Sequence, residues 1–227
     1  MALYKTRFAW QKWKWANAAR RTPFNALYHV NLPPAQTFMR DQKFVVLDCE
    51  MSGLDSDKNE LLSLGWVQIK QGRIDYGSRR HLLVHAGASV GDSIKIHGLC
   101  DRQIAGAASP SKALTLLAQQ IESAVLVFHH ASLDLAFLRT SAMHSFTCPM
   151  IFPYVDTMKI EQKRLERQSR SASLQLNLCR DRYGLPPAFQ HNAMHDAVAT
   201  AELFLAQCAH MASGAGPRLK ELLVSIA

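Results

Sequence analysis

The order in which strand-type and helix-type patterns follow one another constrains the fold of this chain most strongly. Three apolar runs typical of strands come first, at residues 44–47, 61–69 and 74–84. Helical and strand spacings then alternate: helices are predicted at 111–122, 132–143, 158–166, 172–183 and 193–212, and strands at 124–128 and 154–155. This order predicts an α/β fold with a five-stranded mixed sheet flanked by helices.

Charge divides the chain into unequal parts. Its 227 residues include 26 Lys and Arg against 18 Asp and Glu, a formal net charge of +8. Residues 1–40 hold seven of these cations and no acid, so they account for +7. Prolines at 33 and 34 end any helix begun upstream. We therefore predict a basic, Trp-rich helical extension at 1–40, a domain at 41–212 and, after the Gly-Ala-Gly-Pro break, a helical tail at 213–227.

Composition narrows the class of protein. Hydrophobic residues make up 48% and charged residues 19%, which excludes a disordered, collagen-like or coiled-coil chain. No apolar run approaches the roughly 18 residues of a membrane span, so we expect no membrane association. The five cysteines are scattered singly, which is typical of reduced thiols in a cytoplasmic protein. Three tryptophans near the start argue against a mitochondrial transit peptide.

Two acids close the first predicted strand. Because side chains alternate faces along a strand, Asp48 and Glu50 project from the same side, at the end of the sheet where α/β proteins place their ligands. Two carboxylates so close together favour a compensating cation. Solvated acids at an exposed strand end are the alternative.

Three more candidate residues follow strands or begin helices. Asp134 comes two residues after Ser132, which is the expected N-cap of its helix, and an acid there is also favoured by the helix dipole alone. Asn192 is the expected cap of the last helix, which places Asp196 inside that helix and His191 on the loop before it. A mobile imidazole beside a fixed acid suits a general base. Since the cap takes His191 off the helix, a zinc site formed with His195 is not favoured.

Taken together, these motifs resemble the DEDDh group of 3′-to-5′ exonucleases, to which the proofreading epsilon subunit of bacterial DNA polymerase III belongs. The segments 48–54, 96–99 and 127–134 look like successive family motifs, and 155–157 resembles a further one whose acid, Asp156, is not a metal ligand. Met51, His130 and Leu133 depart from the proofreading members. Met51 is closer to oligoribonucleases, which leaves the sugar of the substrate open.

The resemblance implies a ribonuclease-H-like fold and two divalent cations, Mg²⁺ or Mn²⁺. It assigns Asp48, Glu50, Asp134 and Asp196 as metal ligands and His191 as the general base. The activity expected is hydrolysis from the 3′ end of single-stranded or frayed DNA, with release of nucleoside 5′-monophosphates. An exoribonuclease that trims short RNA, and a nucleic-acid-binding polymerase-accessory subunit, are the alternatives.

The resemblance also suggests contacts with the substrate. Residues Met51, Ser52, Gly53 and Leu54 should line the terminal nucleotide, and His97 and Asp92 should contact it; for His97, a turn histidine that holds its own loop is the alternative. The tryptophans and cations of residues 1–30 could bind single-stranded nucleic acid. Packing of this segment against the domain or against a protein partner is somewhat favoured over that role.

Overall fold

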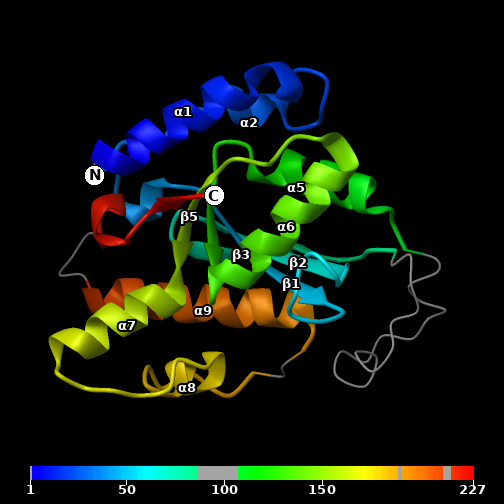
Figure 1. The fold of residues 1–227 in the computed structure, drawn as a ribbon. Coiled ribbons are helices and arrows are strands. Elements are labelled where there is room, and N and C mark those ends of the chain that lie inside the picture. Colours follow the sequence, from blue (N-terminus) through cyan, green and yellow to red (C-terminus); the bar gives the residue numbers. More distant parts are fainter. Residues whose placement is uncertain (1, 86–106, 189–190, 212–215) are drawn as a thin grey trace.

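A twisted sheet of six strands forms the centre of the molecule (Figure 1). The computed structural model describes residues 2–85, 107–188, 191–211 and 216–227. Their strands are β1 (Phe44–Met51), β2 (Leu61–Lys70), β3 (Arg73–Leu83), β4 (Val125–Phe128), β5 (Pro153–Asp156) and β6 (Ser225–Ile226). The spatial order is β3-β2-β1-β4-β5-β6, in which β1, β4 and β5 run parallel and the other pairings are antiparallel. The predicted mixed sheet is confirmed.

The sixth strand corrects two predictions, the five-stranded sheet and the helical tail. Leu219, Leu222 and Ile226 are buried at a spacing that looks helical. The described part of the tail, residues 216–227, nevertheless contains only the 3-10 helix Leu219–Glu221 before Ser225–Ile226 pairs with β5. The open edge of β5 offers backbone hydrogen bonds to this short segment, and a sequence pattern alone does not reveal such an edge.

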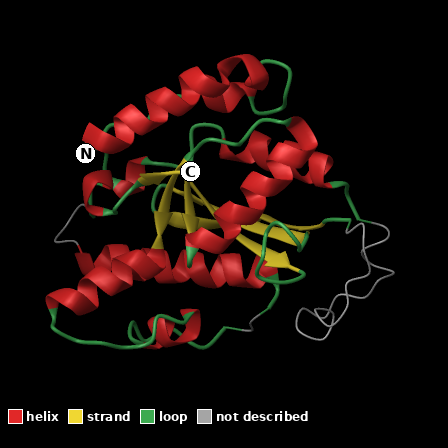
Figure 2. Cartoon of the chain, viewed as in Figure 1, coloured by secondary structure: helices red, strands yellow, loops and turns green. Residues whose placement is uncertain are grey.

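Helices cover both faces of the sheet (Figure 2). On one face lie α5 (Pro110–Ile121) and α6 (Ala131–Phe146), with α1 (Ala2–Ala19) and α2 (Asn25–His29) outside them. On the other face lie α7 (Thr157–Arg167), α8 (Leu176–Asp181) and α9 (Ala193–Met211). A further 3-10 helix, Met39–Asp41, precedes β1. No helix within the described ranges is long and apolar enough to cross a membrane.

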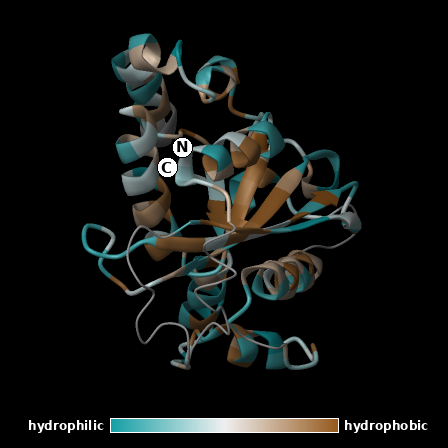
Figure 3. Ribbon diagram, turned by 90° about the vertical axis from the view of Figure 1, so that its right-hand side faces the viewer, coloured by the Kyte–Doolittle hydropathy of each residue, from teal (hydrophilic) through white to brown (hydrophobic). Residues whose placement is uncertain are grey.

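Each face of the sheet has its own hydrophobic core, and the central strands between them are among the most hydrophobic parts of the ribbon (Figure 3). Along β1 the residues alternate between the two cores. Val45 and Leu47 face the core on the α5 and α6 side, whereas Phe44 and Val46 face the core under α9. The same alternation directs Asp48 toward α9.

The N-terminal extension packs on the domain through one side of its helices. Phe8, Phe24, Leu27 and Tyr28 are buried in the core on the α5 and α6 side. The Tyr28 hydroxyl donates a hydrogen bond to the carbonyl of Pro149 at 2.7 Å. This burial supports the packing interpretation of the segment.

We predict that Phe24→Ala lowers the free energy of unfolding by about 3–5 kcal/mol, because it empties a fully buried site where Phe24 meets the ring of Phe146 edge-on at 4.9 Å. Trp13 lies on the same extension but is 79% exposed, so Trp13→Ala should change stability by less than about 0.5 kcal/mol. Urea denaturation of both variants measures the difference. Equal effects would show that the extension does not pack as described.

Candidate active site

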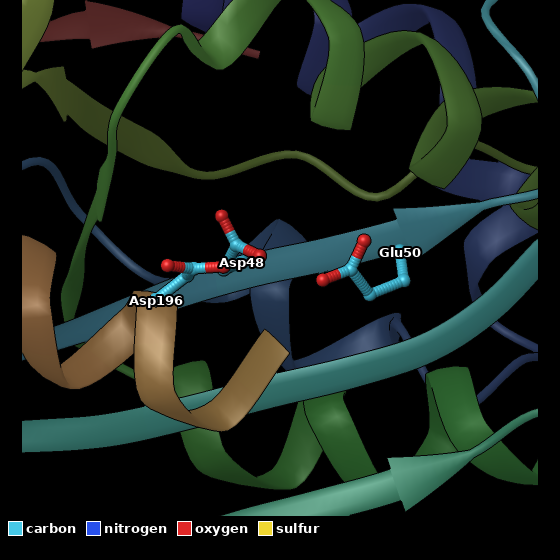
Figure 4. A group of neighbouring side chains, drawn as sticks. All are labelled: Asp48, Glu50 and Asp196. Atoms are coloured by element: carbon cyan, nitrogen blue, oxygen red, sulfur yellow. The ribbon is translucent and has the colours of Figure 1, made fainter. Parts of the chain in front are cut away.

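Three carboxylates converge where β1 passes under the start of α9 (Figure 4). Asp48 and Glu50 project from β1, which continues through both of them to Met51 rather than ending before them. Asp196 comes from the first turn of α9. One oxygen of each of the three carboxylates lies within 4.8 Å of the others. The structure therefore brings together three of the four predicted metal ligands.

A glycine on β2 allows this convergence. Gly65 pairs with Asp48 across the sheet, and the backbone of α9 lies directly on it. A Cβ atom at Gly65 would be 2.0 Å from the carbonyl carbon of Ala193 and 2.1 Å from the nitrogen of Met194. No other residue fits there without moving the helix that carries Asp196. The sequence analysis missed Gly65, although a glycine inside an apolar strand is a recognised sign of close backbone approach.

Asp134, the fourth predicted ligand, is buried in the first turn of α6, beside the cluster. Its Oδ1 accepts a hydrogen bond from the backbone N–H of Cys49 at 3.0 Å. This bond fixes the start of α6 to β1 between the two acids of the strand. Asp134 is near enough to raise the pKa values of both Asp48 and Glu50.

Burial raises the pKa of every acid in the group, and repulsion within the group adds to this for Asp48 and Glu50. Burial, followed by repulsion from Asp134, Asp196 and Glu50, raises the pKa of Asp48 well above its usual range. The same two causes raise the pKa of Glu50 to about 8. Burial raises the pKa of Asp134 to about 7 and also raises that of Asp196, against hydrogen bonds that lower both. The protein thus holds carboxyls that retain protons near neutral pH unless a cation compensates them.

His191 lies on the loop before α9, as the sequence predicted, and lines the same cleft as Asp48 and Asp196. Asn192 caps α9, because its Oδ1 accepts a hydrogen bond from the N–H of His195 at 3.3 Å, so His191 lies off the helix. The backbone of His191 is left-handed, with φ 68°, and its N–H donates to Oδ2 of Asp196 at 2.8 Å. An open cleft of about 520 Å³ lies here, lined by Asp48, His129, His130, Met158, Gln175, Leu176, His191 and Asp196.

Asp156 supports the site from behind, and it corrects one prediction. Ser132 is not the N-cap of α6, which begins at Ala131 with His130 at the cap position and no side-chain cap. The carboxylate of Asp156, which is distant in the sequence, caps this helix instead. It accepts hydrogen bonds from the N–H groups of His130 at 3.0 Å and Ala131 at 3.1 Å. Asp156 also caps α7. It lies outside the acidic cluster.

The loop after β1 differs in part from the expected substrate wall. Met51 packs in the core because the alternation of β1 continues through it, so its burial does not support the predicted contact with a nucleotide. The Ser52 hydroxyl accepts a hydrogen bond from the N–H of Glu60 at 2.9 Å, and Gly53 makes room for the side chain of Asn59. Leu54 is 81% exposed and available to a substrate. Asp92 and His97 lie outside the described residues.

The donor set fits hard divalent cations. Carboxylate oxygens are the ligands that Mg²⁺ and Mn²⁺ prefer. The Oδ1 atom of Asp196 is buried and has no hydrogen-bond partner among the described residues. A buried acceptor without a donor costs free energy, which coordination by a cation would relieve.

Comparison with known proteins decides the family. The exonuclease family model RNase T matches residues 45–204, which include all four acids and His191. The chain belongs to this exonuclease family. It is also 31% identical over 176 residues to the PolC-type DNA polymerase III of Thermotoga maritima, and 25% identical over 172 residues to that of Staphylococcus aureus strain bovine RF122. These matches cover 77% and 76% of the chain but only 12% of each polymerase.

Solved structures share the fold. The nuclease domain of 3′hExo, a DEDDh family member bound to rAMP, superposes with a TM-score of 0.67 at 12% identity, over 83% of this chain and 98% of that one. Exonuclease X in complex with 5′ overhanging duplex DNA gives a TM-score of 0.57 at 18% identity, over 76% and 95% of the two chains. The predicted DEDDh exonuclease resemblance and ribonuclease-H-like fold are confirmed.

We predict that Gly65→Ala displaces the start of α9, so it should lower both the melting temperature and the affinity for Mn²⁺. Overpacking of this kind costs about 1–3 kcal/mol. Gly77→Ala is the matched control, because the nearest atom to its added Cβ is Asp75 Oδ1 at 3.4 Å. Calorimetry with Mn²⁺ and thermal melts of both variants provide the test. Unchanged Mn²⁺ affinity in Gly65→Ala would contradict the role of this contact.

The raised pKa values predict a pH-dependent effect of divalent cations on stability. Between the usual carboxyl pKa near 4 and the value of about 8 for Glu50, the folded protein binds more protons than the unfolded chain does. In EDTA, the free energy of unfolding should therefore fall as pH rises through that window. The rise in melting temperature on adding Mn²⁺ should therefore be larger near pH 8 than near pH 5. In Glu50→Gln, the EDTA form should melt higher than wild type near pH 8. An equal Mn²⁺ effect at both pH values would contradict the assignment.

Proposed function

We propose that the chain is a metal-dependent 3′-to-5′ exonuclease that acts on single-stranded or frayed DNA and releases nucleoside 5′-monophosphates. The observation that carries this proposal is the convergence of Asp48, Glu50 and Asp196, with Asp134 beside them, in a member of the exonuclease family. Two divalent cations, Mg²⁺ or Mn²⁺, would be held by these four acids. When bound, such ions stabilise the attacking and leaving oxygens of phosphoryl displacement.

The protein groups have separable roles in this reaction. His191 accepts the proton of the attacking water, since it shares the cleft with Asp48 and Asp196. The hydrogen bond from the backbone N–H of His191 to Asp196 fixes the position of the base relative to the acid. The start of α9 directs the positive end of its dipole at the site, which favours the anionic groups gathered there. Leu54 offers an exposed apolar wall to the terminal base.

DNA is the proposed substrate because the relatives with the highest sequence similarity reported above are DNA polymerases. The polymerases are far longer than this chain, so we do not propose that this chain assembles with partners as they do. The four described cysteines are buried free thiols, which fits a protein that works in the reducing cytoplasm.

Matched DNA and RNA oligonucleotides, labelled at either end, test the proposal. With Mn²⁺, a 5′-labelled DNA strand should shorten one nucleotide at a time, and a 3′-labelled strand should release labelled mononucleotide first. RNA should be cut more slowly, and both EDTA and Asp196→Ala should abolish cleavage. Release of mononucleotide from the 5′ end first would refute the direction. Faster cleavage of RNA would identify an exoribonuclease.

We predict that His191→Ala lowers kcat by roughly two to four orders of magnitude, the usual contribution of one general base, with little change in Mn²⁺ affinity. His195→Ala is the matched control, because His195 lies on the exposed side of the same helix start and does not line the cleft. Single-turnover kinetics with saturating Mn²⁺ measure both variants. A large loss in His195→Ala with normal turnover in His191→Ala would reverse the assignment.

A further inference from the structure

The outer face of α1 carries two exposed tryptophans. Trp10 is 53% and Trp13 79% exposed, although they lie on a helix whose inner side, at Phe8, is buried. Packing therefore accounts for α1 but not for these two rings. They are three residues apart, so they lie on neighbouring positions of one helix face. Large rings exposed in this way indicate a surface that binds something.

Cations accompany the rings. The Lys14 ammonium lies 4.9 Å from the centre of the Trp10 ring, which holds a positive charge beside a stacking surface. Arg7, Arg20 and Arg21 are also exposed along or just after α1, and no carboxylate pairs with any of these four cations in the part of the chain that the structure describes. Residues 1–40 contain no acid. The surface is suited to a polyanion.

A groove beside this surface extends to the first turn of α6, the helix that also carries Asp134. About 240 Å³ in volume, it lies between α1, α6 and the C-terminal strand, and Arg7, Ser132, Leu135, Arg139 and Tyr154 are among the residues that line it. Ser132 is two residues from His130, which lines the catalytic cleft. Arg7 is three residues from Trp10, at the other end. Arg139 and Arg7 thus line one groove that runs from the start of α6 to α1.

We propose that the α1 surface, defined as Arg7, Trp10, Trp13 and Lys14, binds the upstream part of a single-stranded DNA substrate whose 3′ end occupies the catalytic cleft. Aromatic rings interleaved with cations form the usual platform for single strands, because bases stack on the rings while phosphates meet the charges. This inference rests on the proposed function. A membrane fits less well, since the outer face of α1 presents Thr, Arg, Ala, Trp, Lys and Asn but no aliphatic side chain larger than Ala among its described residues.

Binding in EDTA tests the inference without cleavage. The probes are oligo(dT) of about twenty nucleotides and a matched oligo(rU). The W10A/W13A variant should bind oligo(dT) about tenfold or more weakly, and it should lose most of the tryptophan quenching that the oligonucleotide causes. The R7Q/R139Q variant should reduce the slope of log K against log salt by about 1.4, as expected for two phosphate contacts. Tyr76→Ala, an exposed ring on β3, is the control and should bind like wild type.

Cleavage assays separate this inference from the proposed function. W10A/W13A should degrade a trinucleotide at the wild-type rate, because so short a strand needs only the cleft, but should lose kcat/KM on the long strand. Unchanged affinity, quenching and salt slope in both variants would overturn the inference even if the enzyme is active. If the wild-type protein binds oligo(rU) more tightly than oligo(dT), the inference is overturned in favour of RNA. If the two variants lose binding only to vesicles of anionic phosphatidylserine, it is overturned in favour of a membrane. A wild-type protein that cleaves nothing would refute the proposed function, while the binding result would still decide the surface.

Discussion

Repulsion among the clustered carboxylates is the constraint on which the rest of the site depends. Burial, and after it repulsion between carboxylates that lie within 4.8 Å of one another, raises the pKa values of Asp48 and Glu50, so that ionisation of these groups destabilises the folded chain. The protein offsets part of this cost with backbone donors: Cys49 N–H bonds Asp134, and His191 N–H bonds Asp196. The remainder is what a divalent cation would relieve.

The acids are held together by contacts that do not involve charge. Two features place Asp196 over Asp48: the alternation of β1, and the absence of a side chain at Gly65. Asp156 fixes the start of α6, and with it Asp134, through bonds to two backbone N–H groups. Asp196 and Asp134 are thus each positioned by a neighbour outside the acidic cluster. Substitutions outside the acidic cluster should therefore disturb the site almost as strongly as substitutions within it.

The sequence predicted most of the site because its signals are local. The two acids of β1 follow from a two-residue period, and the separation of His191 from its helix follows from the cap at Asn192. What it could not predict depends on partners distant in the chain. The cap of α6 comes from Asp156 rather than Ser132, β6 forms because β5 has an open edge, and Met51 turns inward because β1 continues past Glu50. Local propensity carries no information about partners that are distant in the chain.

The charge distribution indicates a role for the N-terminal extension beyond packing against the domain. A cleft lined by carboxylates repels the polyanion that it must cleave, and outside residues 1–40 the chain has almost no net positive charge to counter this. Divalent cations neutralise the site itself but not the approach to it. A separate basic surface attracts the strand over a longer range, up to about a Debye length of 10 Å at ordinary salt. Under the proposed function, acids lie where bonds are broken and cations lie where the strand is held, so neither requirement weakens the other.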